Sequence, residues 1–256
     1  MNFAALSQQL DNALTNKKTI ARLTDANPSM TLSDAYEIQK KLIAMRIARG
    51  EKIVGYKVGL TSKEKQEQVH VNRPIYGVLT NAMQIQNNGI CDLSSRIYPR
   101  AEAEIAFIIG KTIHTIVDRD TLLESCSGIC AAIEIIDSRY QNFNFSLCDV
   151  VADNCSASGF VLSDRIHKPH DVDLSNITMS LLVNGKTIAT GSSFAVLENP
   201  IHSLMMLLHV LVDHGEVLHA GSVVLSGAAM VAIDMHAGNT ITHVAEKLGS
   251  VNVRVN

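Results

Sequence analysis

The sequence predicts an α+β fold, in which a helical N-terminal segment (residues 1–50) packs on a mixed, mostly β domain (residues 51–256). Two amphipathic helical patterns fall within the first 50 residues. Most later segments are short runs of alternating or β-rich apolar residues, separated by turns that contain glycine. The chain has no internal repeat and no regular alternation of strands and helices, which argues against a Rossmann fold or an eight-stranded βα barrel.

The two N-terminal helices are predicted from leucine spacing and capping residues. Leucines recur every four residues within 3–15, as on one face of a helix. A second helix is expected to begin at Thr31, which can form a capping pair with Asp34, and to end at Gly50. The apolar stripe between these ends is typical of a helix that packs on a core.

The following elements are predicted from alternation and turn residues. Strands are expected at 52–59, around 78–79, at 100–109 and at 131–137, with a solvated turn or short helix at 63–68, a turn at 73–77 and a short helix at 118–130. In the last third, Asn184-Gly185 predicts a hairpin between 177–183 and 186–190. A helix at 201–214 and strands at 222–225, 230–233, 240–244 and 251–255 complete the chain.

The composition argues against several classes of function. The formal net charge is −3 at pH 7 and no stretch is strongly basic, so nothing indicates binding of nucleic acid or of an anionic membrane. No apolar run is expected to cross a bilayer, and the N-terminus lacks the pattern of a signal peptide. The five cysteines have neither disulfide-framework nor zinc-site spacing, which predicts free thiols in a reducing cytoplasm.

Three carboxylates stand in otherwise apolar strands. Glu102 and Glu104 alternate with alanines, so they point to one side of their strand while the apolar residues point to a core. Glu134 is the only charged residue among residues 131–136. A divalent metal, a basic side chain or water on an exposed face could compensate these charges. Three oxygen donors with no His or Cys nearby favour Mg²⁺ or Mn²⁺ over zinc.

Two weaker signals accompany the carboxylates. Lys57 shares one strand face with Gly55 and Gly59, so other groups can approach it closely, although the residues alone favour a lysine that faces solvent. The small residues at 152–159 predict a loop whose backbone N–H groups could approach an anion. By itself such a loop indicates no more than a turn.

Four motifs in order resemble the fumarylacetoacetate hydrolase superfamily, and within it the branch of 2-oxopent-4-enoate hydratases and 2-oxo-3-hexenedioate (4-oxalocrotonate) decarboxylases. The motifs are Gly55–Ser62, Arg100–Glu104, Ile133–Arg139 and Val151–Asn154. The resemblance extends from the second helix to Leu248–Val251, which is nearly the whole chain. Four motifs together are far more specific than any one of them.

The resemblance implies a set of roles for residues of this chain. Glu102, Glu104 and Glu134 would hold Mg²⁺, with Mn²⁺ as the alternative, and Lys57 would be the active-site lysine. Residues that would bind a small 2-oxo acid substrate are Leu60, Ile75, Ser156 and Ser158. The resemblance also implies a cytoplasmic homo-oligomer that works in complex with the hydratase of its pathway.

The choice of reaction depends on Pro74–Gly77, where hydratases of the family carry an acidic residue in a Pro-Asp-aromatic-Gly turn. This chain has Ile75 instead, as the decarboxylases do, and residues 137–143 also resemble the decarboxylases. An apolar wall suits departing CO2 and disfavours the addition of water. The expected function is therefore Mg-dependent decarboxylation of 2-oxo-3-hexenedioate to 2-hydroxypenta-2,4-dienoate in a meta-cleavage pathway. The alternatives are the hydratase of the same pathway and a β-rich binding module without catalysis.

Overall fold

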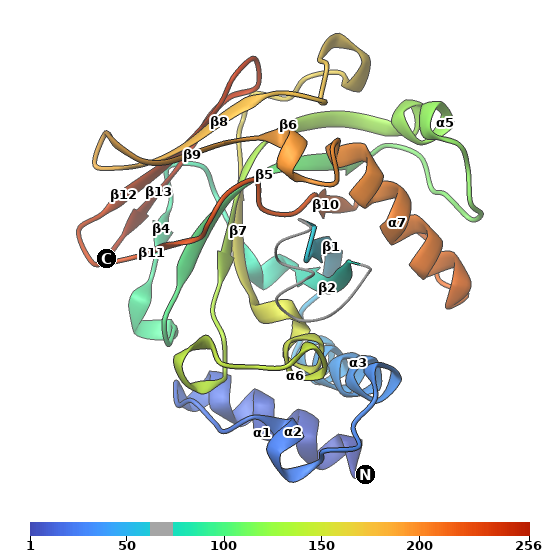
Figure 1. Cartoon of the computed structure of the whole chain (residues 1–256), viewed down its shortest axis with the longest axis vertical. Helices are drawn as coiled ribbons and strands as arrows, with labels where there is room; N and C mark the ends of the chain where they lie inside the picture. The colour runs from blue at the N-terminus through green and yellow to red at the C-terminus, as the bar shows by residue number, and fades with distance from the viewer. Residues whose placement is uncertain (62–73) are drawn as a thin grey trace.

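The computed structural model describes residues 1–61 and 74–256, and it confirms the predicted α+β architecture (Figure 1). The helices near the N-terminus lie at one end of the molecule, and strands make up most of the remainder. The turn or short helix predicted at 63–68 lies outside the described residues, as do Ser62 and the first residue of the turn predicted at 73–77.

The N-terminal helices are α1 (Phe3–Asn16), α2 (Leu23–Ala26) and α3 (Leu32–Ala48). Thr31 and Asp34 form the predicted capping box at the start of α3. Leu10 and Ile38 are fully buried, and they belong to a core cluster shared with Val151 of α6 (Leu147–Ala152). The N-terminal segment therefore packs directly on the rest of the chain.

Within the described residues, the main sheet has eight strands in the order β2-β1-β10-β5-β6-β7-β3, with β11 paired to β5. These strands are β1 (Ile53–Gly59), β2 (Ile75–Thr80), β3 (Gln84–Ile85), β5 (Arg100–Ile109), β6 (Cys126–Ile136), β7 (Ala157–Leu162), β10 (Val223–Leu225) and β11 (Ile233–Asp234). β10 runs parallel to β1 and antiparallel to β5, so it lies between two strands that precede it by more than 100 residues. This insertion brings β1 into the same sheet as β5 and β6.

The second sheet has the order β4-β13-β12-β8-β9 among the described residues. Its strands are β4 (Ile90–Cys91), β8 (Thr178–Val183), β9 (Lys186–Ser192), β12 (Thr240–Ala245) and β13 (Gly249–Val255). Asn184 and Gly185 both have positive φ, of 50° and 80°, in the predicted hairpin turn between β8 and β9. The hairpin prediction is confirmed.

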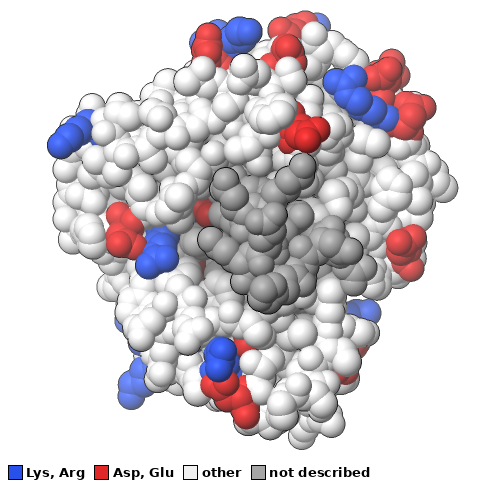
Figure 2. All heavy atoms as spheres, viewed as in Figure 1, with Lys and Arg blue, Asp and Glu red and all other residues white. Residues whose placement is uncertain are grey.

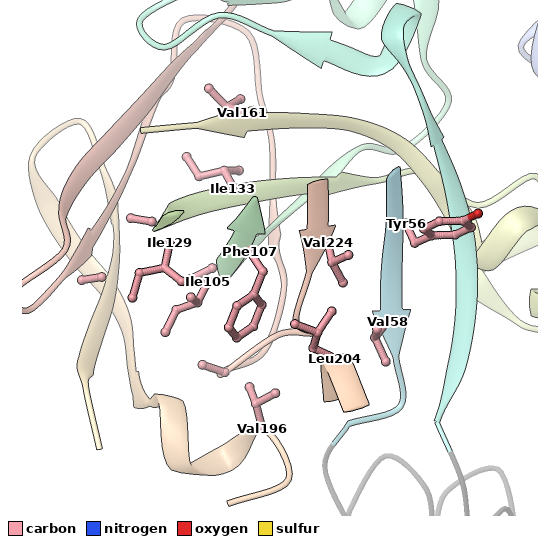
Figure 3. Packing of buried hydrophobic residues seen from close by; sticks show 14 of the residues in the cluster. Tyr56, Val58, Ile105, Phe107, Ile129, Ile133, Val161, Val196, Leu204 and Val224 are labelled. Atoms are coloured by element: carbon pink, nitrogen blue, oxygen red, sulfur yellow. The ribbon is translucent and has the colours of Figure 1, made fainter. Parts of the chain in front are cut away.

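The largest core cluster lies against one face of the main sheet. It combines Ile105 and Phe107 of β5 with residues of the second sheet and of α7 (Pro200–Asp213). Figure 3 shows Phe107 close to Ile105 and Val224, with Leu204 of α7 on the same side. The alternating residues of β5 therefore point into this core as predicted, and the glutamates point to the opposite face.

Three predicted elements need correction. The strand expected at 230–233 is wrong for most of its length, because pairing with β5 begins only at Ile233, the first residue of β11. The helix expected at 118–130 ends early: α5 covers Arg119–Glu124, and β6 begins at Cys126. The physical reason is that β6 pairs with β5 along nearly its whole length and thereby buries apolar residues such as Ile129 and Ile133 in the large core. The turn expected at 73–77 also differs, because Ile75 already belongs to β2 and pairs with Gly59.

The helix predicted at 201–214 is confirmed as α7 (Pro200–Asp213), but it belongs to a longer apolar segment than the sequence analysis expected. Ser193–Asp213 has a mean hydropathy of 1.4 and is long and apolar enough, by length and composition alone, to cross a membrane. In the structure this segment includes α7, whose buried leucines belong to the large core cluster: Leu204, Leu207, Leu208 and Leu211. Core packing therefore accounts for the apolar character of the helix.

The surface in Figure 2 carries both signs of charge. Lys and Arg atoms lie close to Asp and Glu atoms in most of the charged groups on this face. No large area of one sign stands out there, in keeping with the formal net charge of −3.

The large core predicts a strong dependence of stability on Phe107. Because this side chain is fully buried, Phe107→Ala should lower the free energy of unfolding by about 3–5 kcal/mol through lost burial and a residual cavity. Urea unfolding followed by circular dichroism measures the change. Phe194→Ala is the matched control, since Phe194 is 56% exposed and its removal should cost less than about 1 kcal/mol.

Candidate active site and metal centre

Glu102, Glu104 and Glu134 form a compact cluster on β5 and β6. The antiparallel register places Glu102 directly opposite Glu134, and Glu104 two residues further along β5 on the same face. One carboxylate oxygen from each of the three lies within 4.8 Å of the others. Their exposed fractions are 7%, 1% and 0%, so compensation by bulk water, one of the alternatives, is excluded.

Burial makes this cluster electrostatically unfavourable by itself. Loss of hydration raises the pKa of Glu104 well above its ordinary value, and the neighbouring Glu134 carboxylate adds to the rise. Burial also raises the pKa of Glu134, while the positive charge of Lys57 works in the opposite direction. The cluster therefore needs positive charge or bound protons to remain in the folded protein.

Lys57 of β1 supplies one positive charge. Its Nζ atom lies 2.8 Å from Oε1 of Glu134 and donates a hydrogen bond of 3.3 Å to the carbonyl oxygen of Cys155. Burial by itself would lower the pKa of Lys57, but the nearby carboxylates, Glu134 first, outweigh burial and raise it. The side chain is only 4% exposed, so the solvent-facing interpretation of Lys57 is wrong.

Steric crowding explains why glycine occupies the positions beside Lys57. A Cβ atom on Gly55 would lie 1.9 Å from the carbonyl oxygen of Val223 on the neighbouring strand β10. Gly77, the partner of Lys57 on β2, leaves room for the carbonyl oxygen of Asn154, which a Cβ would approach to 2.6 Å. Backbone segments therefore come close to Lys57 from both sides because side chains are absent there.

The donor set of the cluster fits a hard divalent cation. Oε2 of Glu104 accepts a hydrogen bond of 2.7 Å from the backbone N–H of Gly227. In the part of the chain that the structure describes, Oε1 of Glu104 and Oε2 of Glu134 are buried and accept no hydrogen bond, while Oε1 of Glu134 faces the ammonium of Lys57. A bound divalent cation would add to the compensation that the ammonium of Lys57 gives to Glu134. Carboxylate oxygens of this kind suit Mg²⁺ or Mn²⁺.

Ser156 lies next to this cluster, but Ser158 faces elsewhere. Ser156 is 3% exposed, and its hydroxyl has no hydrogen-bond partner among the residues of known placement. It directly follows Cys155, whose carbonyl oxygen accepts from Lys57. The Ser158 hydroxyl instead accepts a hydrogen bond from Arg96, in a separate cavity of about 470 Å³ between β7 and α1.

The segment predicted as a loop at 152–159 is more ordered than expected. A 3₁₀ turn covers Asn154–Ser156, and β7 begins at Ala157. Asn154, Cys155 and Ser156 all have positive φ, between 50° and 58°. The Asn154 side chain holds this uncommon backbone by bonding both the N–H and the C=O of Val78, at 2.7 and 2.9 Å. The turn is thereby fixed beside Lys57.

Ile75 and Leu60 lie near Lys57 in the strands β2 and β1 and their continuation. Ile75 pairs with Gly59, two residues from the Lys57–Gly77 pair, so it shares the sheet face of Lys57. It is 4% exposed and packs in the core cluster beneath the N-terminal helices. Leu60 follows β1 with a φ of 56° and packs against that cluster.

Sequence reasoning missed the contribution of Ser226 and Gly227. Gly227 donates its N–H to Glu104, and the fully buried hydroxyl of Ser226 makes no hydrogen bond within the described ranges. A Cβ on Gly227 would lie 2.3 Å from the hydroxyl oxygen of Thr61, so this position requires glycine. A Ser-Gly pair after a predicted strand indicates a turn. The local sequence does not indicate that β10 lies beside β5, so it could not place this turn at the glutamate cluster.

Comparison with known proteins shows the family to which the chain belongs. The profile described as fumarylacetoacetate (FAA) hydrolase C-terminal matches residues 56–256. The chain is 39% identical over 252 residues to a 4-oxalocrotonate decarboxylase from a Pseudomonas species, covering 98% of this chain and 97% of that one. It is 34% identical over 250 residues to 2-hydroxyhexa-2,4-dienoate hydratase from Comamonas testosteroni, covering 96% and 95% of the two chains.

A solved structure gives the same result. 4-Oxalocrotonate decarboxylase from Pseudomonas putida G7, complexed with magnesium and adipate, matches with a TM-score of 0.95 and 35% identity. The match covers 99% of this chain and 97% of that chain. The chain therefore belongs to the fumarylacetoacetate hydrolase family, together with decarboxylases and hydratases that match it over nearly their whole length.

Proposed function

We propose that the chain catalyses Mg-dependent decarboxylation of 2-oxo-3-hexenedioate (4-oxalocrotonate) to 2-hydroxypenta-2,4-dienoate. The observation that carries the proposal is the buried cluster of Glu102, Glu104 and Glu134 with Lys57 in contact with it. The similarity to three 4-oxalocrotonate decarboxylases, at 36–39% identity, supports the proposal. So does the similarity to the structure of one such enzyme complexed with magnesium and adipate.

The three glutamates would hold the metal through their buried oxygens. When bound, Mg²⁺, or Mn²⁺ in its place, would supply Lewis-acid polarisation of the 2-oxo acid end of the substrate. The surrounding strands keep bulk water away from the carboxylates, which strengthens every charge interaction inside the site. The chain itself supplies the remaining groups.

Lys57 would stabilise the charge that develops in the reaction. The bond between C5 and the distal carboxylate carbon breaks, CO2 leaves, and the electron pair moves through the conjugated carbons to the C2 oxygen. Lys57 stays protonated because the neighbouring carboxylates raise its pKa, so its ammonium can donate a hydrogen bond to that oxygen. Proton uptake by the resulting dienolate gives 2-hydroxypenta-2,4-dienoate. No further cofactor is needed, since the ketone of the substrate accepts the electrons.

Ile75 and Ser156 would shape the rest of the pocket. Ile75 places an apolar, non-titratable side chain on the sheet face of Lys57, so the residue at this position cannot transfer a proton to activate water. The buried Ser156 hydroxyl, which lacks a protein partner among the described residues, can donate to a carboxylate of the substrate. Leu60 would contact the apolar part of the substrate, and Ser158 would act at most indirectly, through Arg96.

The hydratase reaction on 2-hydroxypenta-2,4-dienoate is the alternative. Four hydratases named 2-keto-4-pentenoate hydratases match at 34–35% identity, only slightly below the decarboxylases. The two activities share the 2-oxo acid end of their substrates, so the metal cluster does not separate them. Ile75 is the observation that favours decarboxylation.

We further propose, by the same family resemblance, a cytoplasmic homo-oligomer that associates with the hydratase of its pathway. The five cysteines are all free, which suits a reducing compartment.

The first prediction from the proposed function concerns the reaction and its metal. Supplied with Mg²⁺, the protein should release CO2 from 2-oxo-3-hexenedioate, and excess EDTA should abolish turnover. Parallel assays with 2-hydroxypenta-2,4-dienoate should show hydration at less than a tenth of that rate. Turnover that persists in EDTA would contradict the metal assignment, and faster hydration than decarboxylation would favour the alternative.

The second prediction concerns the ligands. Glu104→Gln should weaken Mg²⁺ binding by more than roughly 100-fold, since even residues behind the direct ligands contribute 10–100-fold to metal affinity. Calorimetric titration with Mg²⁺ measures the loss, and circular dichroism checks the fold. The control is Glu124→Gln, because Glu124 is exposed at the end of α5 and lies outside the cluster. Equal affinity in both variants would refute the assignment.

The third prediction concerns Ile75. Ile75→Asp should reduce decarboxylation at least tenfold and raise hydration of 2-hydroxypenta-2,4-dienoate, because it restores a group that can transfer a proton. Since Ile75 also packs in the core, stability is measured alongside, and Ile75→Asn serves as the matched polar control that cannot titrate. If Asp and Asn leave both activities unchanged, the argument from this position fails.

A further inference from the structure

Arg100 continues the row of side chains formed by the metal-site glutamates. It begins β5, and residues two apart on a strand share a face, so Arg100, Glu102 and Glu104 point the same way. Its partners across the sheet, Ile136 on β6 and Asp234 on β11, lie on that face with it. Two strand residues span roughly 6.6 Å, which sets the separation between the backbones of Arg100 and Glu102.

The guanidinium of Arg100 is anchored on one side and open on the other. Nε donates a hydrogen bond of 2.8 Å to Oδ1 of Asp234. The guanidinium carbon lies 4.2 Å from the centre of the Phe143 ring, a cation–π contact. The two terminal nitrogens donate to no protein group among residues 1–61 and 74–256. Together they form the fork that binds a carboxylate through two parallel hydrogen bonds.

A cavity of about 480 Å³ opens beside this fork. Arg100, Asn142, Phe143 and His236 line it together with Tyr98 and Asp234. Asn142 and Phe143 both have positive φ, of 56° and 53°, in a turn that presents the aromatic ring to the guanidinium. The side chain of Asp234 is 63% exposed, so solvent largely screens its repulsion of an incoming anion. The cavity thus has room and positive charge for one carboxylate group.

We infer that Arg100 binds the distal carboxylate of a six-carbon dicarboxylate whose 2-oxo acid end lies at the glutamate cluster. The inference rests on the proposed function for the orientation of the substrate. A six-carbon chain with bonds of about 1.5 Å spans roughly 6 Å between its terminal carbons, so it is long enough to extend from one side chain to the next along this face of β5. A five-carbon monocarboxylate has no group to reach Arg100.

The contact between Arg100 and the distal carboxylate favours binding of dicarboxylates and does not accelerate the chemical step. The distal carboxylate loses its negative charge as CO2 departs, so an ion pair to it is stronger in the bound substrate than in the transition state. Arg100 therefore holds the dicarboxylate and orients the bond that breaks. Its loss should raise KM and leave kcat nearly unchanged or slightly higher. A purely structural role would instead lower stability and affect all ligands alike.

The test compares Arg100→Gln, Arg100→Lys and the unchanged protein, each loaded with Mg²⁺. The control is Arg22→Gln, because Arg22 is also an exposed arginine paired with one aspartate, with a side chain 40% exposed against 38% for Arg100. Two readouts are used: KM and kcat for 2-oxo-3-hexenedioate, and calorimetric affinity for adipate and for hexanoate. Hexanoate has the same number of carbons and lacks the second carboxylate.

Arg100→Gln should raise KM roughly 10–100-fold, with kcat within threefold, and should weaken adipate binding by a similar factor while hexanoate binding stays the same. Arg100→Lys should retain part of the adipate affinity. The inference is overturned if Arg100→Gln binds adipate as the unchanged protein does, or if adipate and hexanoate lose affinity equally. If Arg100→Gln loses its preference for adipate over hexanoate while the unchanged protein shows no decarboxylation, the inference stands and the proposed reaction is refuted.

Discussion

The structure depends on the compensation of three carboxylates that are removed from water. Glu102, Glu104 and Glu134 are at most 7% exposed, and unpaired charges at that depth would cost several kcal/mol each. Lys57 of strand β1 compensates part of this negative charge, because its ammonium lies 2.8 Å from Glu134. The divalent cation that we propose for this site would compensate the cluster further, so the same positive charge would serve both the fold and the chemistry.

One face of the main sheet packs in the core and stabilises the fold, and the opposite face carries the charged side chains of the candidate site. One face of β5 carries Ile105 and Phe107 into the large core that α7 and the second sheet complete. The opposite face carries the glutamates, Lys57 and Arg100. Because strand side chains alternate, a single strand serves both purposes, and the rigid core fixes the positions of the charged groups. Close backbone approaches at Gly55 and Gly77 complete the pocket.

Much of the fold was predictable from local patterns, and the failures have physical causes. Strand β5 and the hairpin at Asn184-Gly185 follow from alternation and turn chemistry, which depend only on neighbouring residues. The helix expected at 118–130 begins after its cap Asp118 but ends at Glu124, because the residues from Cys126 onward form a long ladder with the distant strand β5. Ser158 turned away from the site because a bulge in the β6–β7 ladder leaves it without a partner residue.

The sequence by itself determined that Glu102 and Glu104 share a face, that Glu134 needs a partner, and, through its motifs, which family the chain resembles. The three-dimensional arrangement was needed to show that Glu134 lies opposite Glu102, that Lys57 is buried, and that Gly227 donates to Glu104. These placements depend on β10 pairing between β1 and β5, strands far away in the chain. Side-chain alternation is a local property of the backbone, whereas strand pairing is settled by which distant segments together bury the most apolar surface.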